Sequence, residues 1–186
     1  MSVTRERIME LAEELIVTKG YNAFSYQDIS SELGIKNAAI HYYFPSKANL
    51  GTSIVKNNRQ RFEEMVENMH IMKFDELKQL ESFLRVYAKS ARENKICVIG
   101  SLGPDFNTLP ETSQTELKEM TDRIVEWLSS ILETGREKGI FNFKGDARSR
   151  ALLVLSNMVA SLQLSRILDK TDFKSIHQAL LEDLKA

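Results

Sequence analysis

The fold is decided by residues 25–47, which read SYQDISSELGIKNAAIHYYFPSK. Ser25 precedes Asp28 by three residues, and this capping-box pattern opens a helix by satisfying its free amide groups. Gly34 stands where a helix ends in the left-handed conformation, and Ile35 supplies the apolar contact that usually follows such an end. The stretch therefore predicts a short helix that stops in a tight turn.

A second and shorter helix is expected directly after this turn. Asn37 is expected to cap it, and the helix should run from Ala38 to about Tyr43, before Pro45, which has no amide to continue it. Two helices joined by a tight turn form a helix-turn-helix, in which the second helix enters the major groove of DNA. The stretch thus points to duplex DNA as a partner.

These residues also resemble a known family. GIKNAAIHYYFPSK, residues 34–47, is similar to the end of the DNA-binding domain of TetR-type repressors, which usually reads close to GVSKGTLYHYFPSK. GYNAFSYQDI, residues 20–29, resembles the junction that precedes it, and the resemblance extends over about residues 4–56. It implies an all-α protein, with a three-helix DNA-binding domain over residues 1–47 and a larger ligand-binding and dimerisation domain over residues 48–186.

The helix predicted to enter the major groove, Ala38 to about Tyr43, has small side chains on its outer face. Ala38 and Ala39 replace the family's Gly-Thr, and both are small enough for a groove about 12 Å wide. The family's Ser-Lys is replaced by Lys36-Asn37, and its usual Tyr by His41. Polar side chains around this face are expected to reach bases, sugars or phosphates. The residues predicted to contact DNA are Ser25, Tyr26, Lys36, Asn37, Ala38, Ala39, His41, Tyr42, Tyr43 and Lys47.

Two positions of the motif have specific expected roles. Lys47 should anchor a phosphate through its ammonium group at the start of the next helix. Phe44 should lie in the core, and a core position is also the alternative for Tyr43.

The distribution of charge supports the same surface. The net charge of −1 argues by itself against a nucleic-acid-binding protein. From Leu33 to Phe62, however, there is no Asp or Glu, and an acid-free segment with several cations is typical of a phosphate-binding surface. The alternative is an ordinary solvated basic face. The cations of this segment are Lys36, Lys47, Lys56, Arg59 and Arg61.

Composition indicates a globular helical protein. Of 186 residues, 42% are hydrophobic, only three are proline, and strand-like alternation is scarce. The single cysteine, Cys97, rules out an internal disulfide and fits a reducing compartment. No apolar run approaches the roughly 18 residues of a membrane span, and the N-terminus reads as an amphipathic helix, so a cytoplasmic location without membrane contact is expected.

Apolar residues at helical spacing predict long helices beyond residue 47, for a total of about nine. Thr108 and Glu111 form a second capping-box pattern, which should open a long helix that ends near Gly135 to Gly139. The helices of this region are expected to be capped by Ser46, Asp75, Thr108 and Asp146.

The predicted helix over residues 147–168 is apolar nearly all round. Such a helix must be covered on both sides, and in a small chain a second subunit is the simplest cover. The last helix, residues 172–185, should complete a homodimer interface. The alternative is a central helix enclosed by its own chain.

The resemblance implies a ligand cavity in the larger domain. An aromatic cavity with a few polar groups suits a small, mostly apolar effector, although each residue alone could be plain core. Cys97 carries a further alternative, as an electrophile or redox sensor. The predicted lining residues are Phe83, Tyr87, Cys97, Asn107 and Trp127.

Enzyme chemistry is not expected. His41, His70 and His177 lack metal-ligand spacing, no glycine-rich phosphate loop occurs, and we expect neither a metal nor a cofactor. The sequence instead predicts a dimeric, ligand-responsive transcriptional regulator, by family resemblance a repressor, that reads a pseudo-palindromic operator and is released by its effector. The alternative is a helical protein-protein adaptor, which would not be retained on DNA-cellulose.

Overall fold

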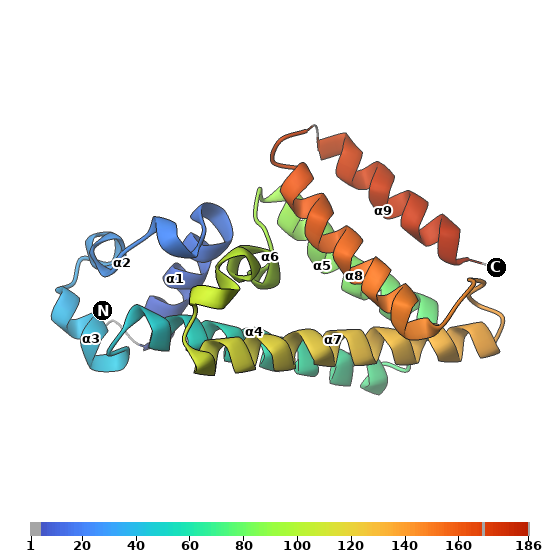
Figure 1. Cartoon of the computed structure of the whole chain (residues 1–186), viewed down its shortest axis with the longest axis horizontal. Helices are drawn as coiled ribbons and strands as arrows, with labels where there is room; N and C mark the ends of the chain where they lie inside the picture. The colour runs from blue at the N-terminus through green and yellow to red at the C-terminus, as the bar shows by residue number, and fades with distance from the viewer. Residues whose placement is uncertain (1–4, 169, 186) are drawn as a thin grey trace. The chain divides into compact units, whose positions relative to one another are not determined.

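The structure, a computed structural model, describes residues 5–168 and 170–185, which form an all-helical chain (Figure 1). These residues hold nine α-helices and two short 3-10 helices, so the predicted all-α fold is confirmed. Within them no helix combines the length and apolar character needed to cross a membrane. The helices are α1 (Arg5–Lys19), η1 (Tyr21–Ala23), α2 (Tyr26–Leu33), α3 (Asn37–Tyr43), α4 (Lys47–Ile71), α5 (Glu76–Arg92), α6 (Val98–Leu102), η2 (Gly103–Thr108), α7 (Glu111–Glu137), α8 (Ala147–Leu164) and α9 (Lys170–Leu184).

Contacts divide the chain into two compact units. The N-terminal unit contains the described residues up to Gln60 together with Val98–Met120, and the C-terminal unit contains Arg61–Cys97 together with the described residues from Thr121 onward. α4 and α7 therefore each contribute to both units. The functional boundary after Lys47 follows a different criterion, the reach of the DNA-binding motif, and stays a prediction.

The N-terminal unit is built around α1. This helix packs against α2 and α6, and α2 packs against α3. Ile8, Ile29 and Ile40, one from each of the first three helices, are completely buried. A buried hydrogen bond of 2.8 Å runs from the Ser101 hydroxyl to the Ile16 carbonyl and ties α6 to α1. Residues 98–120 thus help to hold α1 in place, and α1 in turn packs against α2 of the DNA-binding motif.

Local signals at the start of the motif act as the sequence predicts. The Ser25 hydroxyl accepts from the Asp28 amide, and the Asp28 carboxylate accepts from the Ser25 amide at 2.7 Å, which completes the capping box. Gly34 ends α2 with a φ of 64°, and Phe44 is buried. The predicted cap of α3 is wrong, because Asn37 is the first residue of the helix and Lys36 occupies the cap position without a side-chain hydrogen bond.

The caps of the longer helices are confirmed at all but one position. Thr108 does not cap α7, because α7 begins at Glu111 and Thr108 is the last residue of η2, where its hydroxyl donates to the Asp105 carbonyl at 2.8 Å. The remaining caps each accept a hydrogen bond from the amide three residues further on: Ser46 from Asn49, Asp75 from Lys78 and Asp146 from Ser149.

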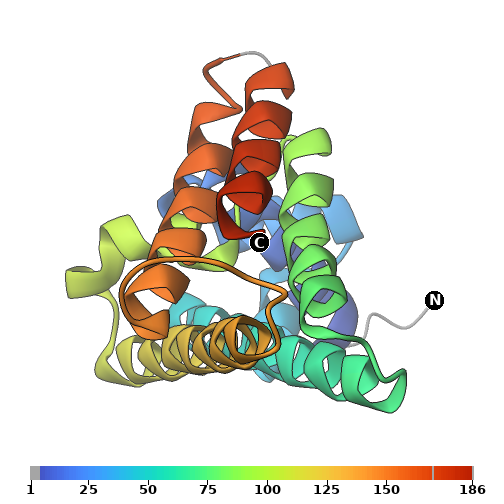
Figure 2. The same ribbon diagram turned by 90° about the vertical axis from the view of Figure 1, so that its right-hand side faces the viewer.

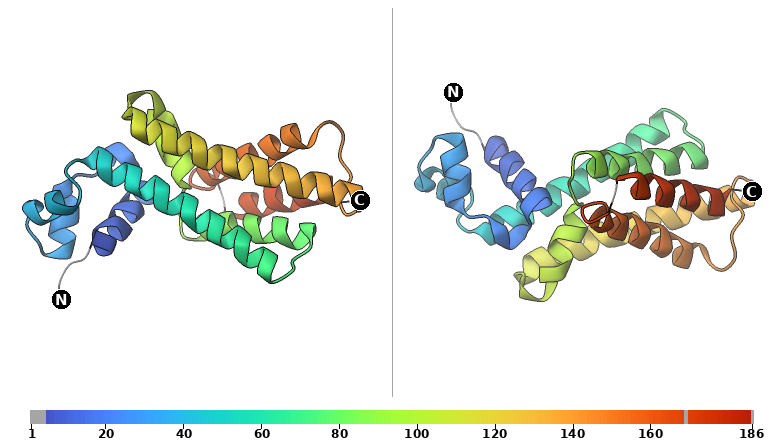
Figure 3. Two further views of the ribbon diagram at one scale, coloured as in Figure 1. Left: turned by 90° about the horizontal axis from the view of Figure 1, so that it is seen from below. Right: turned by 90° about the horizontal axis from the view of Figure 1, so that it is seen from above.

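Segments of α4 and α7 lie side by side within each unit (Figure 3). In the N-terminal unit the hydroxyls of Thr52 and Ser113 are 2.6 Å apart. In the C-terminal unit the ring centroids of Phe62 and Trp127 are 5.5 Å apart. α4 and α7 therefore contact each other within both units.

In the C-terminal unit α5, α8 and α9 lie side by side (Figure 2). Val154, Met158 and Leu162 on α8 are completely buried in this bundle. On α9, Phe173 and Leu184 are buried in the same way. The three helices thus enclose a core of their own.

α8 is shorter than predicted, and one of its faces is exposed. It ends at Leu164, so the last four residues of the predicted range 147–168 lie outside the helix. Its own chain does not cover it all round, because Leu152 and Leu153 are 47% and 53% exposed, and this disagrees with the alternative of a central helix enclosed by its own chain. Leu155, by contrast, is buried in its own chain. The outer face of α8 is therefore the apolar surface that remains uncovered.

Gly135 occupies a position in α7 where even a methyl group has no space. A Cβ there would lie 2.3 Å from Cδ2 of Phe141, whose side chain is only 2% exposed. We expect Gly135→Ala to lower the free energy of unfolding by about 1–3 kcal/mol, although alanine favours a helix by about 1 kcal/mol. Urea denaturation measures the change. The double variant with Phe141→Leu should recover part of the loss, and a Gly135→Ala protein as stable as wild type would contradict the expectation.

Candidate nucleic-acid interface

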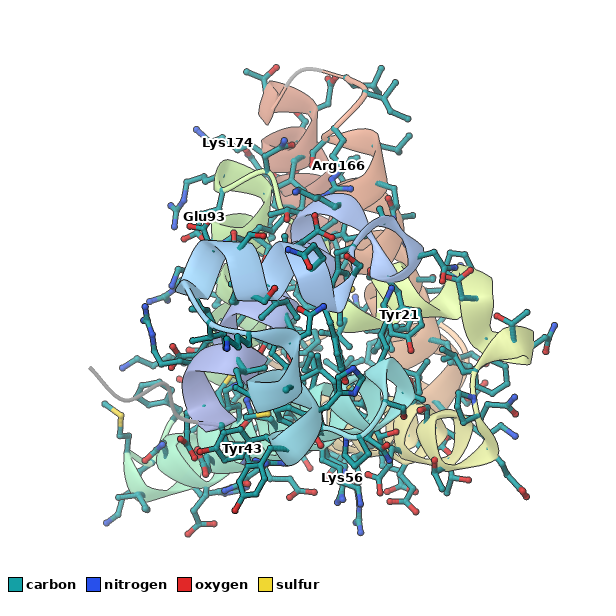
Figure 4. The ribbon with its side chains drawn as sticks, turned by 90° about the vertical axis from the view of Figure 1, so that its left-hand side faces the viewer. Tyr21, Tyr43, Lys56, Glu93, Arg166 and Lys174 are labelled. Atoms are coloured by element: carbon teal, nitrogen blue, oxygen red, sulfur yellow. The ribbon has the colours of Figure 1, made fainter. Side chains whose placement is uncertain are left out.

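The outer face of α3 presents most of the residues predicted to contact DNA. Asn37, Ala38, Ala39 and His41 are exposed, whereas Ile40 is completely buried and fixes the rotation of the helix. Two tyrosines follow at the end of the helix. Tyr42 is 82% exposed and Tyr43 (Figure 4) is 37% exposed. Their rings meet edge to face with centroids 5.0 Å apart. The exposed face of α3 therefore has small side chains in its first turn and hydroxyl groups at its end.

Tyr26 is placed differently from its prediction. Its side chain is buried, and its hydroxyl donates to the Phe44 carbonyl at 2.9 Å. Burial raises the pKa of Tyr26 to about 12. The centroids of the Tyr26 and His41 rings are 4.8 Å apart. The expected side-chain contact with DNA is at odds with this packing. As the first residue of α2, Tyr26 retains a backbone amide without an intrahelical partner, and that amide is the group it can offer to a phosphate.

Ser25 has a structural role that bears on its predicted contact with DNA. Its hydroxyl donates to the Asp28 carboxylate at 2.7 Å, and this hydrogen bond lowers the pKa of Asp28. The cap therefore keeps an ionised carboxylate beside Ser25. A phosphate contact by Ser25 would have to share a hydroxyl that already stabilises the start of α2.

Lys47 is turned inward. Its ammonium donates to the Phe24 carbonyl at 2.5 Å and lies over the rings of Phe24 and Tyr21, 4.3 Å and 4.9 Å from their centroids. Burial lowers the pKa of Lys47. An ammonium carries three hydrogens, so a phosphate contact by Lys47 would be an additional bond made from this anchored position. Lys36, in contrast, is exposed.

Acidic side chains from α7 lie beside the acid-free segment, residues 33–62. Lys56 (Figure 4) forms an ion pair of 3.1 Å with Glu116 on α7, and Arg59 lies 3.4 Å from the same carboxylate and 3.9 Å from Glu119. The side chain of Glu116 is only 14% exposed, which favours a persistent pair over a solvated one. Two of the five cations of the predicted phosphate-binding surface therefore form ion pairs inside the N-terminal unit, and the full extent of that surface stays a prediction.

Four of the five predicted ligand-binding residues belong to the C-terminal unit, and three of them gather in an aromatic cluster. The ring of Phe83 lies 5.2 Å from that of Tyr87 and 5.5 Å from that of Trp127. Phe62, on α4, completes the cluster at 5.5 Å from Trp127 and 6.4 Å from Phe83. The sequence marks Phe62 as part of the apolar stripe of α4, and only packing shows that it faces these rings.

Polar atoms of this cluster are few. The Trp127 indole nitrogen is buried and has no hydrogen-bond partner. Burial raises the pKa of Tyr87 well above its usual value, with a smaller contribution from Cys97, which is partly exposed. Asn107 does not join them, because it is exposed and belongs to the N-terminal unit.

Comparisons with known proteins agree with this architecture. Residues 8–52 match the family described as bacterial regulatory proteins, tetR family. A solved structure of a TetR-family transcriptional regulator from Agrobacterium tumefaciens is similar with a TM-score of 0.91 and 31% identity, over 98% of this chain and 97% of that one.

Two curated relatives are similar at lower identity. The HTH-type transcriptional regulator in the lacX 3'region of Lactococcus lactis is 28% identical over 137 residues, which cover 69% of each protein. The HTH-type transcriptional repressor BepR of Brucella suis is 22% identical over 160 residues, which cover 82% of this chain and 76% of that protein.

Proposed function

The chain belongs to the TetR family of bacterial transcriptional regulators and is not an enzyme, and from that premise we propose that it is a ligand-responsive repressor. In this proposal a homodimer in the cytoplasm binds a pseudo-palindromic operator through residues 1–47. A small, mostly apolar effector that binds within residues 48–186 releases it. The name of the Brucella suis relative supports the choice of repressor over activator.

One observation carries the DNA-binding part of the proposal. The outer face of α3 combines exposed small residues in its first turn with exposed ring donors at its end, which suits a helix that lies in the major groove between phosphates. Ala39 is suited to contact a thymine methyl, and Asn37 a base edge. His41, Tyr42 and Tyr43 are suited to phosphates and sugars, which set the position of the helix on the duplex.

The dimer is supported by the outer face of α8. Leu152, Leu153 and Leu164 are each more than 40% exposed. The polar side chains between them each donate one hydrogen bond within the helix, Asn157 to the Leu153 carbonyl at 2.8 Å and Ser156 to the same carbonyl at 3.1 Å. These bonds reduce the number of hydrogen-bonding groups that covering this face would strand, which favours an interface between subunits. The exposed side chains of α9 are mostly polar, so within the proposed range 172–185 we expect α9 to form the rim of that interface.

The effector site is supported by the aromatic cluster. The buried indole N–H of Trp127 lacks an acceptor, and such a group costs free energy unless a partner arrives. An apolar effector with one acceptor atom would supply it. Phe62 belongs to α4, whose first residue is Lys47, so a shift of this helix on effector binding would reach the last residue of the proposed DNA-binding domain.

Selection of bound fragments from the source genome tests the proposal directly. We expect enrichment of a pseudo-palindrome with half-sites about one helical turn apart, and lower affinity for it in the presence of an effector that changes tryptophan fluorescence. Failure to enrich any sequence over bulk DNA would contradict the proposed function.

Trp127 gives a selective test of the effector site, because it is the only tryptophan in the chain. We expect Trp127→Ala to weaken effector binding while effector-free operator affinity stays near wild type, and the lost coupling should be about 1–3 kcal/mol. Operator titrations with and without effector measure it. The control is Leu128→Ala, which removes a fully buried neighbour on α7 and should lower stability without a selective effector defect. Equal behaviour of the two variants would assign Trp127 to packing alone.

A further inference from the structure

A chain of hydrogen bonds joins α2 to α3 on the exposed side of the DNA-binding motif. The Gln27 side-chain nitrogen donates to the Ser31 hydroxyl at 3.1 Å, and the Asn37 side-chain nitrogen donates to the Gln27 side-chain oxygen at 3.4 Å. All three side chains are exposed. Gln27 and Ser31 are four residues apart and so lie on one face of α2, while Asn37 is the first residue of α3.

The backbones that carry these side chains are firmly held. α2 starts in the capping box of Ser25 and Asp28, and Ile29 is completely buried. α3 is fixed by Ile40, which is also completely buried. The hydrogen-bond chain therefore adds order to side chains rather than to helices.

Its effect falls on the amide of Asn37. A primary amide has two N–H hydrogens and one carbonyl oxygen. One hydrogen is bound to Gln27, so the other hydrogen and the oxygen remain available to a further partner as one donor and one acceptor. Ala38 and Ala39 follow directly and are too short to hold the start of α3 away from a base pair.

Adenine matches this pair of groups. In the major groove it presents an N6 donor next to an N7 acceptor, and asparagine binds both together. We propose that Asn37 reads an adenine in each half-site and that Gln27, supported by Ser31, is the positioning residue that orients its amide. This inference rests on the proposed function, because it requires that α3 lies in the major groove.

The test uses the full-length protein and an operator obtained by selection with wild type. Affinities are measured for a set of operators in which each base pair of one half-site is varied singly. Asn37→Ala should lower the preference for A·T at one position by about 5- to 150-fold. Gln27→Ala should lower the preference at that same position by about 2- to 12-fold, the equivalent of one neutral hydrogen bond, and should add little in the Asn37→Ala background.

Glu32→Gln is the matched control, because Glu32 is exposed on the same helix. It should leave the preference at every position unchanged. Thermal unfolding of each variant checks that the helices are intact.

Three results would overturn the proposal, and they differ in what else they overturn. If wild type binds no DNA specifically, the proposed function fails with it. If wild type binds but Asn37→Ala keeps every base preference, only the reading role of Asn37 fails. If Gln27→Ala weakens all operators equally, Gln27 is a brace between helices or a phosphate contact and does not position Asn37.

Discussion

A Leu153→Glu variant is expected to be monomeric at micromolar concentration and to lose most of its operator affinity. Leu153 is 53% exposed on the outer face of α8, so a carboxylate there is harmless in the monomer. Between subunits the same carboxylate would be buried without a partner, which is strongly unfavourable. Because paired binding modules gain about 10²- to 10⁴-fold from their linkage, loss of the dimer should weaken operator binding by a factor in that range.

Light scattering and operator titration measure the two effects. The matched control is Val86→Glu, which replaces another apolar residue of the C-terminal unit with 49% exposure. It should leave both the dimer and the operator affinity intact. A Leu153→Glu protein that stays dimeric would refute the α8 interface. Leu155 and Leu162 are unsuitable for this test, because both are buried within their own chain and their replacement would unfold it.

Operator affinity should depend on salt only as strongly as the cations among the predicted DNA contacts allow, and these are Lys36 and Lys47. If Lys36 and Lys47 on each of two subunits neutralise phosphates, about four counterions are released and log affinity falls with log salt at a slope of about −3.6. A fourfold rise in salt would then cost about 150-fold in affinity. If all five cations of the acid-free segment took part, the slope would be about −9 and the loss about 10⁵-fold.

Titration at several salt concentrations distinguishes these cases. Lys36→Ala should reduce the magnitude of the slope by about 1.8, since it removes one cation from each subunit. The same replacement at Lys56 should leave the slope unchanged, because that ammonium is paired with Glu116. A flat titration would contradict phosphate binding altogether. A slope near −9 would mean that the ion pairs of α4 with α7 open on DNA.

The parts of the fold that could be predicted from sequence are those set by neighbours along the chain. The cap at Ser25, the turn at Gly34 and the cap at Asp146 each depend on residues within four positions, and all are confirmed. The exception, Thr108, shows the limit of a pattern. It is the last residue of the preceding 3-10 helix, and α7 begins only at Glu111, so the spacing between the two residues does not produce a cap.

The candidate site could be predicted as a stretch but not as a surface. The partners of Lys47, Lys56 and Arg59 lie 23, 60 and 57 residues away in the chain, and no local pattern identifies them. The same holds for Tyr26, whose hydroxyl meets a carbonyl 18 residues on. Side-chain direction in a helical protein is set by such distant contacts, and a spacing rule reports only which face a residue occupies.

The contribution of residues 98–120 to the N-terminal unit has a consequence for recombination. A gene fragment that ends after Gln60 encodes the DNA-binding motif without the Ser101 hydroxyl that binds the Ile16 carbonyl, and without the α7 segment that pairs with α4. A single crossover at that point would combine the DNA-binding motif of one protein with residues 98–120 of another. This compact unit is encoded by two separate segments of the gene. Exchange of DNA specificity between relatives therefore requires that both segments are transferred together.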